Sequence, residues 1–154
     1  QVESARIGDV LDIFRGAATP YLIVRDAVGA IEFYKKAFDA TEVMRLVGKD
    51  GRVGHAEVRV GAGIVMLAEE MDDHPGPQTL GGSPVAMMFY VKDVDAQVAK
   101  AIAAGGTLNR PVADQFYGDR SGGVADPYGY VWWIATHKED VSAAEIEKRM
   151  KAME

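Results

Sequence analysis

Two side chains able to do acid–base chemistry lie two positions apart in one short segment. Residues 55–60 alternate strictly between polar and apolar side chains, which predicts a β-strand with one packed and one open face. His55 and Glu57 then share the open face and could act as a general acid/base pair. Together with Glu69 they could also bind a displaced metal ion. A surface ion pair without a chemical role is the third interpretation and the one we favour.

A second polar group lies in the C-terminal half of the chain. It comprises Gln115, Tyr117, Asp119 and Arg120. These side chains could bind the polar end of a ligand, with Arg120 as the partner of an anion. The alternative is a turn held by hydrogen bonds of Asp119 and Arg120. The sequence shows no nucleophile–base–acid triad, phosphate-binding loop or nucleotide motif.

Length, composition and net charge exclude several classes of protein and of binding partner. The 154 residues suit one domain or two small modules, and the absence of cysteine excludes disulfides and thiolate chemistry. We expect a cytoplasmic protein without a signal peptide. The net charge of -6 argues against nucleic-acid binding and would suit cationic ligands. No apolar run approaches the roughly 20 residues of a membrane span.

An internal repeat indicates how the chain positions these residues. The segments 21–26 and 88–93 both read as a strand that runs into a helix-capping aspartate, and the two aspartates are 67 positions apart. Two further pairs follow in the same order at nearly the same spacing, Arg52 with Arg120 and Gly63 with Gly129. The repeat predicts two β-α-β-β-β modules in an α+β fold.

The expected elements follow from hydrophobic periodicity and turn residues. Helices are predicted at 27–38, with Ile31, Tyr34 and Phe38 on its apolar stripe, and from 94 to the glycines 105–106. The predicted later strands are 41–47, 54–60 and 63–68, then 107–112, 121–125 and 130–136. We divide the chain into an extension (1–18), a first module (19–70), a linker loop (71–83), a second module (84–137) and a C-terminal helix (138–154).

Several short motifs resemble one known superfamily. They are Gly54–Glu57, Val91–Asp93, Gln115–Gly122, Asp126–Gly129 and Ile134–His137. The chain from about Thr19 onward resembles the vicinal-oxygen-chelate superfamily of glyoxalase I, bleomycin-resistance proteins and extradiol dioxygenases. The stretch 115–122 is similar to its PhnB-like branch. The resemblance implies curved mixed sheets that form a cleft, with helices on the outer side.

The resemblance also implies where a metal ion would bind. Metal-dependent members take their ligands from the first and last strands of each module. By position, these places fall on Thr19, Leu67, Ala86 and Trp133. None has a carboxylate or imidazole, so we expect no metal and no other cofactor, with a divalent ion as the less favoured case. A shift of register by one residue would bring in Pro20, Ala68, Val85 and Trp132, which are no better as ligands.

Strand alternation assigns the side chains that line the cleft. The cleft-facing set is Tyr21, Ile23, Val65, Met88, Tyr90, Val131 and Trp133. Ordinary core packing is the alternative for these residues. Trp133 distinguishes the two interpretations most clearly, because a flat ring at that place could stack on a planar ligand or simply close the site.

Two functions therefore compete. The first is a metal-free protein that binds or sequesters a small, partly aromatic molecule, as bleomycin-resistance-like members do. The second is an enzyme, either a lyase or isomerase that uses His55 and Glu57 or a metal-dependent enzyme. Whether the chain is an enzyme stays open at this point. A homodimer is expected, because residues 1–16 carry apolar side chains that a single chain has no evident way to bury.

Overall fold

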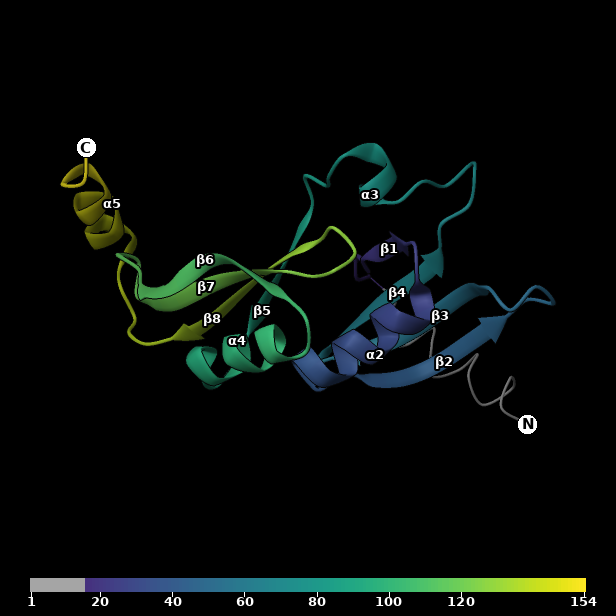
Figure 1. Ribbon diagram of the computed structural model, residues 1–154. Helices are drawn as coiled ribbons and strands as arrows, with labels where there is room; N and C mark the ends of the chain where they lie inside the picture. The colour runs from purple at the N-terminus through teal and green to yellow at the C-terminus, as the bar shows by residue number, and fades with distance from the viewer. Residues whose placement is uncertain (1–15) are drawn as a thin grey trace.

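The two predicted modules are present in the computed structural model, which describes residues 16–154 (Figure 1). The first consists of β1 (Tyr21–Val24), α2 (Ala27–Phe38), β2 (Thr41–Val47), β3 (Val53–Val60) and β4 (Gly63–Glu69). The second consists of β5 (Ala86–Tyr90), α4 (Val94–Ala103), β6 (Thr107–Asp114), β7 (Asp119–Ala125) and β8 (Val131–His137). The predicted α+β fold is confirmed. The short helix expected within residues 1–16 falls outside the described part of the chain.

Both modules have the same sheet topology. The strand orders are β1-β4-β3-β2 and β5-β8-β7-β6, and the first and last strands of each module run parallel. Tyr21 pairs with Met66 in the first sheet, and Met88 pairs with Trp133 in the second. These pairs occupy equivalent places, so the repeat in the sequence is a repeat in structure.

The two long helices cover the same side of the sheets and pack against each other (Figure 1). The side chain of Asp26 accepts a hydrogen bond from the Gly29 N–H and caps α2, and Asp93 caps α4 in the same way. The predicted stripe of α2 is fully buried. In α4, Ile102 is 40% exposed, because it lies about 100° around the helix from the buried Ala101.

An aromatic cluster with one carboxylate joins the modules. Trp132 packs on α2, with its ring 4.4 Å from that of Phe38 and 5.2 Å from that of Tyr34 between centroids. The carboxylate of Asp126 accepts hydrogen bonds from the Tyr34 hydroxyl at 2.7 Å and from the Trp132 indole N–H at 3.0 Å. Since α2 belongs to the first module and the other two residues to the second, these contacts fix one module against the other.

The predicted facing of β4 was wrong by one residue. Val65 and Leu67 are buried, and Leu67 pairs with Leu22 and Ala56 in the core. Met66 faces the other way, with Tyr21. The cause is the turn: Gly63 is already paired with Val60 in β4, whereas Gly129 lies in a longer turn before β8 begins.

The connecting segments add two short features. The linker contains a one-turn helix, α3 (Pro77–Leu80), where only a loop was expected. The helix α5 (Ala143–Lys151) begins after Ser142, whose hydroxyl accepts from the Glu145 N–H at 3.2 Å. It extends from one end of the molecule without a buried residue (Figure 1). In the described part of the chain, no helix combines the length and apolar character needed to cross a membrane.

Candidate functional site

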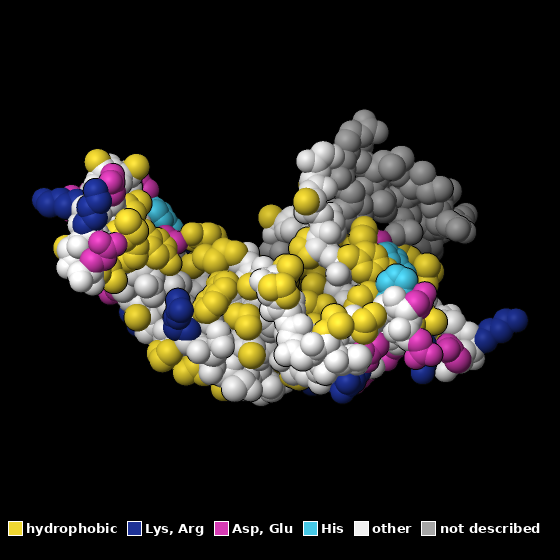
Figure 2. Space-filling model, turned by 90° about the horizontal axis from the view of Figure 1, so that it is seen from above, with side chains coloured by type: hydrophobic (Ala, Val, Ile, Leu, Met, Phe, Trp, Pro, Cys, Tyr) yellow, Lys and Arg dark blue, Asp and Glu magenta, His cyan; other side chains and the backbone are white. Residues whose placement is uncertain are grey.

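The sheet face turned away from α2 and α4 is the candidate site, and we call it the open face. Tyr21, Met88 and Tyr90 are about half exposed there, and Trp133 is half-buried beside Met88. Viewed from above, the molecule is hollowed, and hydrophobic side chains gather along the hollow (Figure 2). The side chains lie on the predicted face, and their binding of a ligand stays a prediction.

On the first sheet, three side chains form a hydrogen-bonded chain. The Tyr21 hydroxyl lies 2.7 Å from His55 Nδ1, and His55 Nε2 lies 2.7 Å from Glu57 Oε2. Glu57 is only 1% exposed, and Met44 and Met66 are its pairing neighbours on the flanking strands. The favoured interpretation of a surface ion pair therefore does not fit its carboxylate end, which is inside the protein.

The partners of His55 set its protonation pattern. Burial, and then the negative charge of Glu57, raises the pKa of Tyr21, so the phenol keeps its proton. A neutral His55 satisfies both contacts when the Tyr21 hydroxyl donates to Nδ1 and Nε2–H donates to Glu57. The chain can pass a proton between the buried carboxylate and the half-exposed hydroxyl, which borders a cavity with Ile23 and His74.

The third residue of the proposed metal alternative is engaged elsewhere. Glu69 accepts a hydrogen bond from the Ala27 N–H at 3.0 Å and so contributes to the start of α2. Within residues 16–154, no three His, Asp or Glu side chains converge in a way that could hold a metal ion. The set of His55, Glu57 and Glu69 is therefore not assembled.

A second cluster occupies the far end of the open face. The Tyr90 hydroxyl donates to Asp119 at 2.6 Å, and His137 lies 2.9 Å from Asp119 and 2.7 Å from Asp140. Hydrogen bonds to Asp119 and then to Asp140 raise the pKa of His137. The sequence separates these residues widely. Their meeting depends on the pairing of Asp119 with His137 across β7 and β8.

The remaining predicted binding residues make contacts within the protein. Arg120 donates to Asp95 of α4 at 2.8 and 3.0 Å and to Asp114 at 3.2 Å. Its guanidinium therefore lies on the helix side, and the proposed anion partner is already neutralised away from the open face. Gln115 donates to a neighbouring backbone carbonyl, and Tyr117 packs edge-on against the ring of Phe116.

The places that correspond to metal ligands carry no carboxylate or imidazole. They are occupied by Thr19, Ala86 and Trp133, with Met66 in place of Leu67 after the correction of β4. The Arg110 guanidinium, which sequence reasoning missed, stands 4.9 Å from the centre of the Trp133 ring. A divalent cation prefers oxygen, imidazole or thiolate donors, so this set does not fit one.

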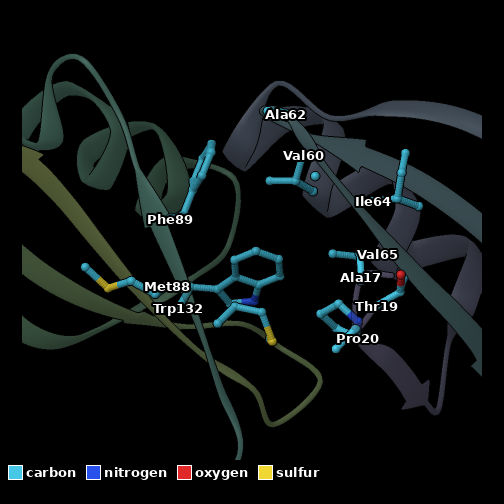
Figure 3. A pocket seen from close by; sticks show the side chains of 13 residues that line it. Ala17, Thr19, Pro20, Val60, Ala62, Ile64, Val65, Met88, Phe89 and Trp132 are labelled. Carbon is cyan, nitrogen blue, oxygen red and sulfur yellow. The ribbon is translucent and has the colours of Figure 1, made fainter. Parts of the chain in front are cut away.

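A separate cavity of about 310 Å³ lies where the modules meet (Figure 3). Its walls come from residues 17–20 before β1, the turn into β4, the strand β5 and Trp132 of β8. Lining side chains include Thr19, Val60, Val65, Met88, Phe89 and Trp132. Apart from the Thr19 hydroxyl and the Trp132 indole nitrogen, these side chains are apolar, so the cavity suits a hydrocarbon group rather than a reacting polar one.

Sequence and structure comparisons place the chain among known proteins. An uncharacterised protein of Mycobacterium tuberculosis is 40% identical over 151 residues, covering 94% of this chain and 89% of the relative. The crystal structure of TioX from Micromonospora sp. ML1 has a TM-score of 0.61 at 23% identity, covering 82% of this chain and 100% of that one.

A PhnB protein from Bacillus cereus, described as a putative 3-demethylubiquinone-9 3-methyltransferase, has a TM-score of 0.61 at 18% identity. That match covers 77% of this chain and 98% of the other, and at this identity it supports the fold alone. The sequence model of the Glyoxalase/Bleomycin resistance protein/Dioxygenase superfamily matches residues 13–134. The chain therefore belongs to this superfamily.

Proposed function

We propose that the protein binds or sequesters a small, partly aromatic molecule on its open face without a metal ion. The observation that carries the proposal is the half-buried Trp133, flanked by the exposed Met88 and Tyr90, at a place where metal-dependent members are expected to hold a ligand for the ion. When a planar molecule covers aromatic and thioether groups that are in contact with water, the removal of this apolar surface from water stabilises the complex.

The proposal includes the partners of the chain. A homodimer would cover part of the exposed apolar surface of the open face, and light scattering that gives a monomer at all micromolar concentrations would contradict it. A cytoplasmic location and the lack of nucleic-acid or membrane partners stay predictions.

Binding can be tested with 2-naphthamide, a neutral planar probe, by isothermal titration calorimetry. Trp133→Ala is expected to weaken binding about tenfold, because an aromatic contact adds about 0.5–1.5 kcal/mol to the burial of its area. The control is Val28→Ala, an exposed apolar side chain on the helix side, which should leave the affinity unchanged. Equal losses in both variants, or no binding by the wild type, would contradict the proposal.

The metal-free part of the proposal has its own test. Elemental analysis of protein purified without a chelator should find no stoichiometric divalent ion. One bound zinc, iron or manganese per chain would contradict it.

A second candidate function rests on the chain of Tyr21, His55 and Glu57. A buried carboxylate that orients a histidine towards an accessible hydroxyl is the arrangement that proton-transfer enzymes of the lyase and isomerase type need. The test is exchange of carbon-bound protons next to the carbonyl of small ketones in heavy water, followed by proton NMR. An exchange lost in His55→Gln would support catalysis. Exchange no faster than in buffer would leave binding as the function.

A further inference from the structure

Arg110 is a charged residue whose guanidinium lies on an aromatic ring of the open face. The Cζ atom of the guanidinium lies 4.9 Å from the centre of the Trp133 ring, a distance at which a cation is attracted by the ring electrons. Among residues 16–154, no hydrogen bond or ion pair engages the Arg110 side chain. It therefore differs from Arg120 and Arg149, which are held by carboxylates.

A β-bulge aims this side chain at the open face. Leu108 pairs with Val124 and Arg110 with Gly123, so Asn109 is an extra residue in β6. At such a bulge two side chains oppose one residue of the partner strand and point to the same side. The Asn109 amide nitrogen lies 3.4 Å from where a Cβ of Gly123 would stand, which puts it on the same side as Trp133.

The partner strand leaves room for this stack. A Cβ at Gly123 would stand 2.5 Å from Cζ3 of Trp133, closer than real atoms approach. The indole therefore lies directly on the backbone of β7, and Arg110 lies over the indole. Since no hydrogen bond within residues 16–154 uses the N–H donors of the guanidinium, they are available to a ligand.

The buried carboxylates of the open face are engaged with other partners. Glu57 is hydrogen-bonded to His55, and Asp119 accepts from Tyr90 and lies within hydrogen-bond distance of His137. Arg110 is therefore the charged group in contact with the Trp133 ring, although the net charge of the chain is -6.

We propose that the open face takes a planar carboxylate, with the acid group on Arg110 and Asn109 and the flat body beside Trp133 and Met88. A guanidinium and a carboxylate form paired, charge-assisted hydrogen bonds of matching geometry. This inference rests on the proposed function and assigns the charge of its ligand. It reverses the expectation of a cationic ligand that came from the net negative charge of the chain. Salt screens the attraction of distant surface charges, so the direct contact with Arg110 decides the charge of the ligand.

Three probes of one shape and different charge test the inference: 2-naphthoate, 2-naphthamide and 2-naphthylmethylammonium. By calorimetry, the wild type is expected to bind the carboxylate about tenfold more tightly than the amide and to bind the ammonium most weakly. Arg110→Met should remove the preference for the carboxylate, because the carboxylate loses a charge-assisted pair of hydrogen bonds and the amide only a neutral one. Arg110→Lys should restore only part of it, because an ammonium lacks the planar pair of donors.

The control is Arg52→Met, which removes the same charge from an exposed side chain in the β2–β3 hairpin. It should keep the full preference for the carboxylate. A loss equal to that of Arg110→Met would assign the effect to net charge and overturn the inference. Equal binding of carboxylate and amide by the wild type overturns the inference alone, whereas no binding of any probe overturns the proposed function with it.

Discussion

At the scale of single residues, burial decides what His55 and Glu57 can do. Alternation along one strand places them on one face, and this much follows from the sequence. The burial of the Glu57 carboxylate depends on parts of the chain far from it in sequence, so local sequence gives no sign of it. The hydroxyl of Tyr21 reaches His55 only through the pairing of β1 with β4 and of β4 with β3.

Arg110 was missed for a similar reason. Simple alternation cannot predict a β-bulge, and the bulge in β6 is what turns Asn109 and Arg110 to one side. Arg120 was noticed because of its motif, yet it is paired with Asp95 on the helix side. The sequence therefore indicated that an arginine could bind an anion, but the strand register of β6 and β7 determines which arginine is available for this.

The pKa of His137 leads to a prediction at this scale. The pKa is raised by Asp119 and Asp140, so the folded protein binds the proton more tightly than the unfolded chain. The stabilisation is fully present below the ordinary value of about 6.5 and is lost as the pH rises through the folded pKa. The His137 ring signals in NMR should titrate above 6.5, and Asp140→Asn should lower the midpoint. A midpoint at or below 6.5 in the wild type would contradict the hydrogen-bonded cluster.

At the scale of elements, helices were easier to predict than strand facing. The bounds of α2 and its buried stripe follow from Asp26 and the helical period of apolar residues. The facing of β4 did not follow, because Gly63 and Gly129 look alike in sequence but occupy different places in their turns. A difference of one residue in turn length reverses every side chain of a strand.

Gly123→Ala tests the contact between β7 and the indole. The new methyl group would overlap the Trp133 ring, so the ring must move and the free energy of unfolding should fall by about 1–3 kcal/mol. Gly54→Ala is the matched control in β3, where the open space around the glycine predicts little change. Urea unfolding measures both variants. A Gly123→Ala variant as stable as Gly54→Ala would mean that the ring does not rest on the strand.

At the scale of the whole molecule, the repeat predicted two modules, and a buried polar contact joins them. Tyr34 and Asp126 are 5% exposed or less, and their hydrogen bond crosses from α2 to the turn before β8. The repeat could not predict this contact, because it links unlike parts of the two modules. Burial raises the pKa of Asp126, against the hydrogen bonds that favour its charged form.

Tyr34→Phe should therefore weaken the contact between the two modules. Loss of a buried hydrogen bond to a carboxyl group is expected to lower the free energy of unfolding by about 1.5–3 kcal/mol. Tyr117→Phe, which removes a hydroxyl from a tyrosine at the β6–β7 turn that is 36% exposed, should change it by less than about 0.5 kcal/mol. Thermal and urea unfolding give the comparison. Equal stability of the two variants would show that the contact does not hold the modules together.

The central claim, a metal-free binding face around Trp133, is tested most directly by an NMR titration of isotope-labelled protein dialysed against a chelator. On addition of 2-naphthamide, the largest shifts are expected at the Trp133 indole and at the amides of Met88 and Tyr90, and added zinc or manganese should not alter them. Shifts confined to other surfaces, or binding that appears only after a metal ion is added, would contradict the claim.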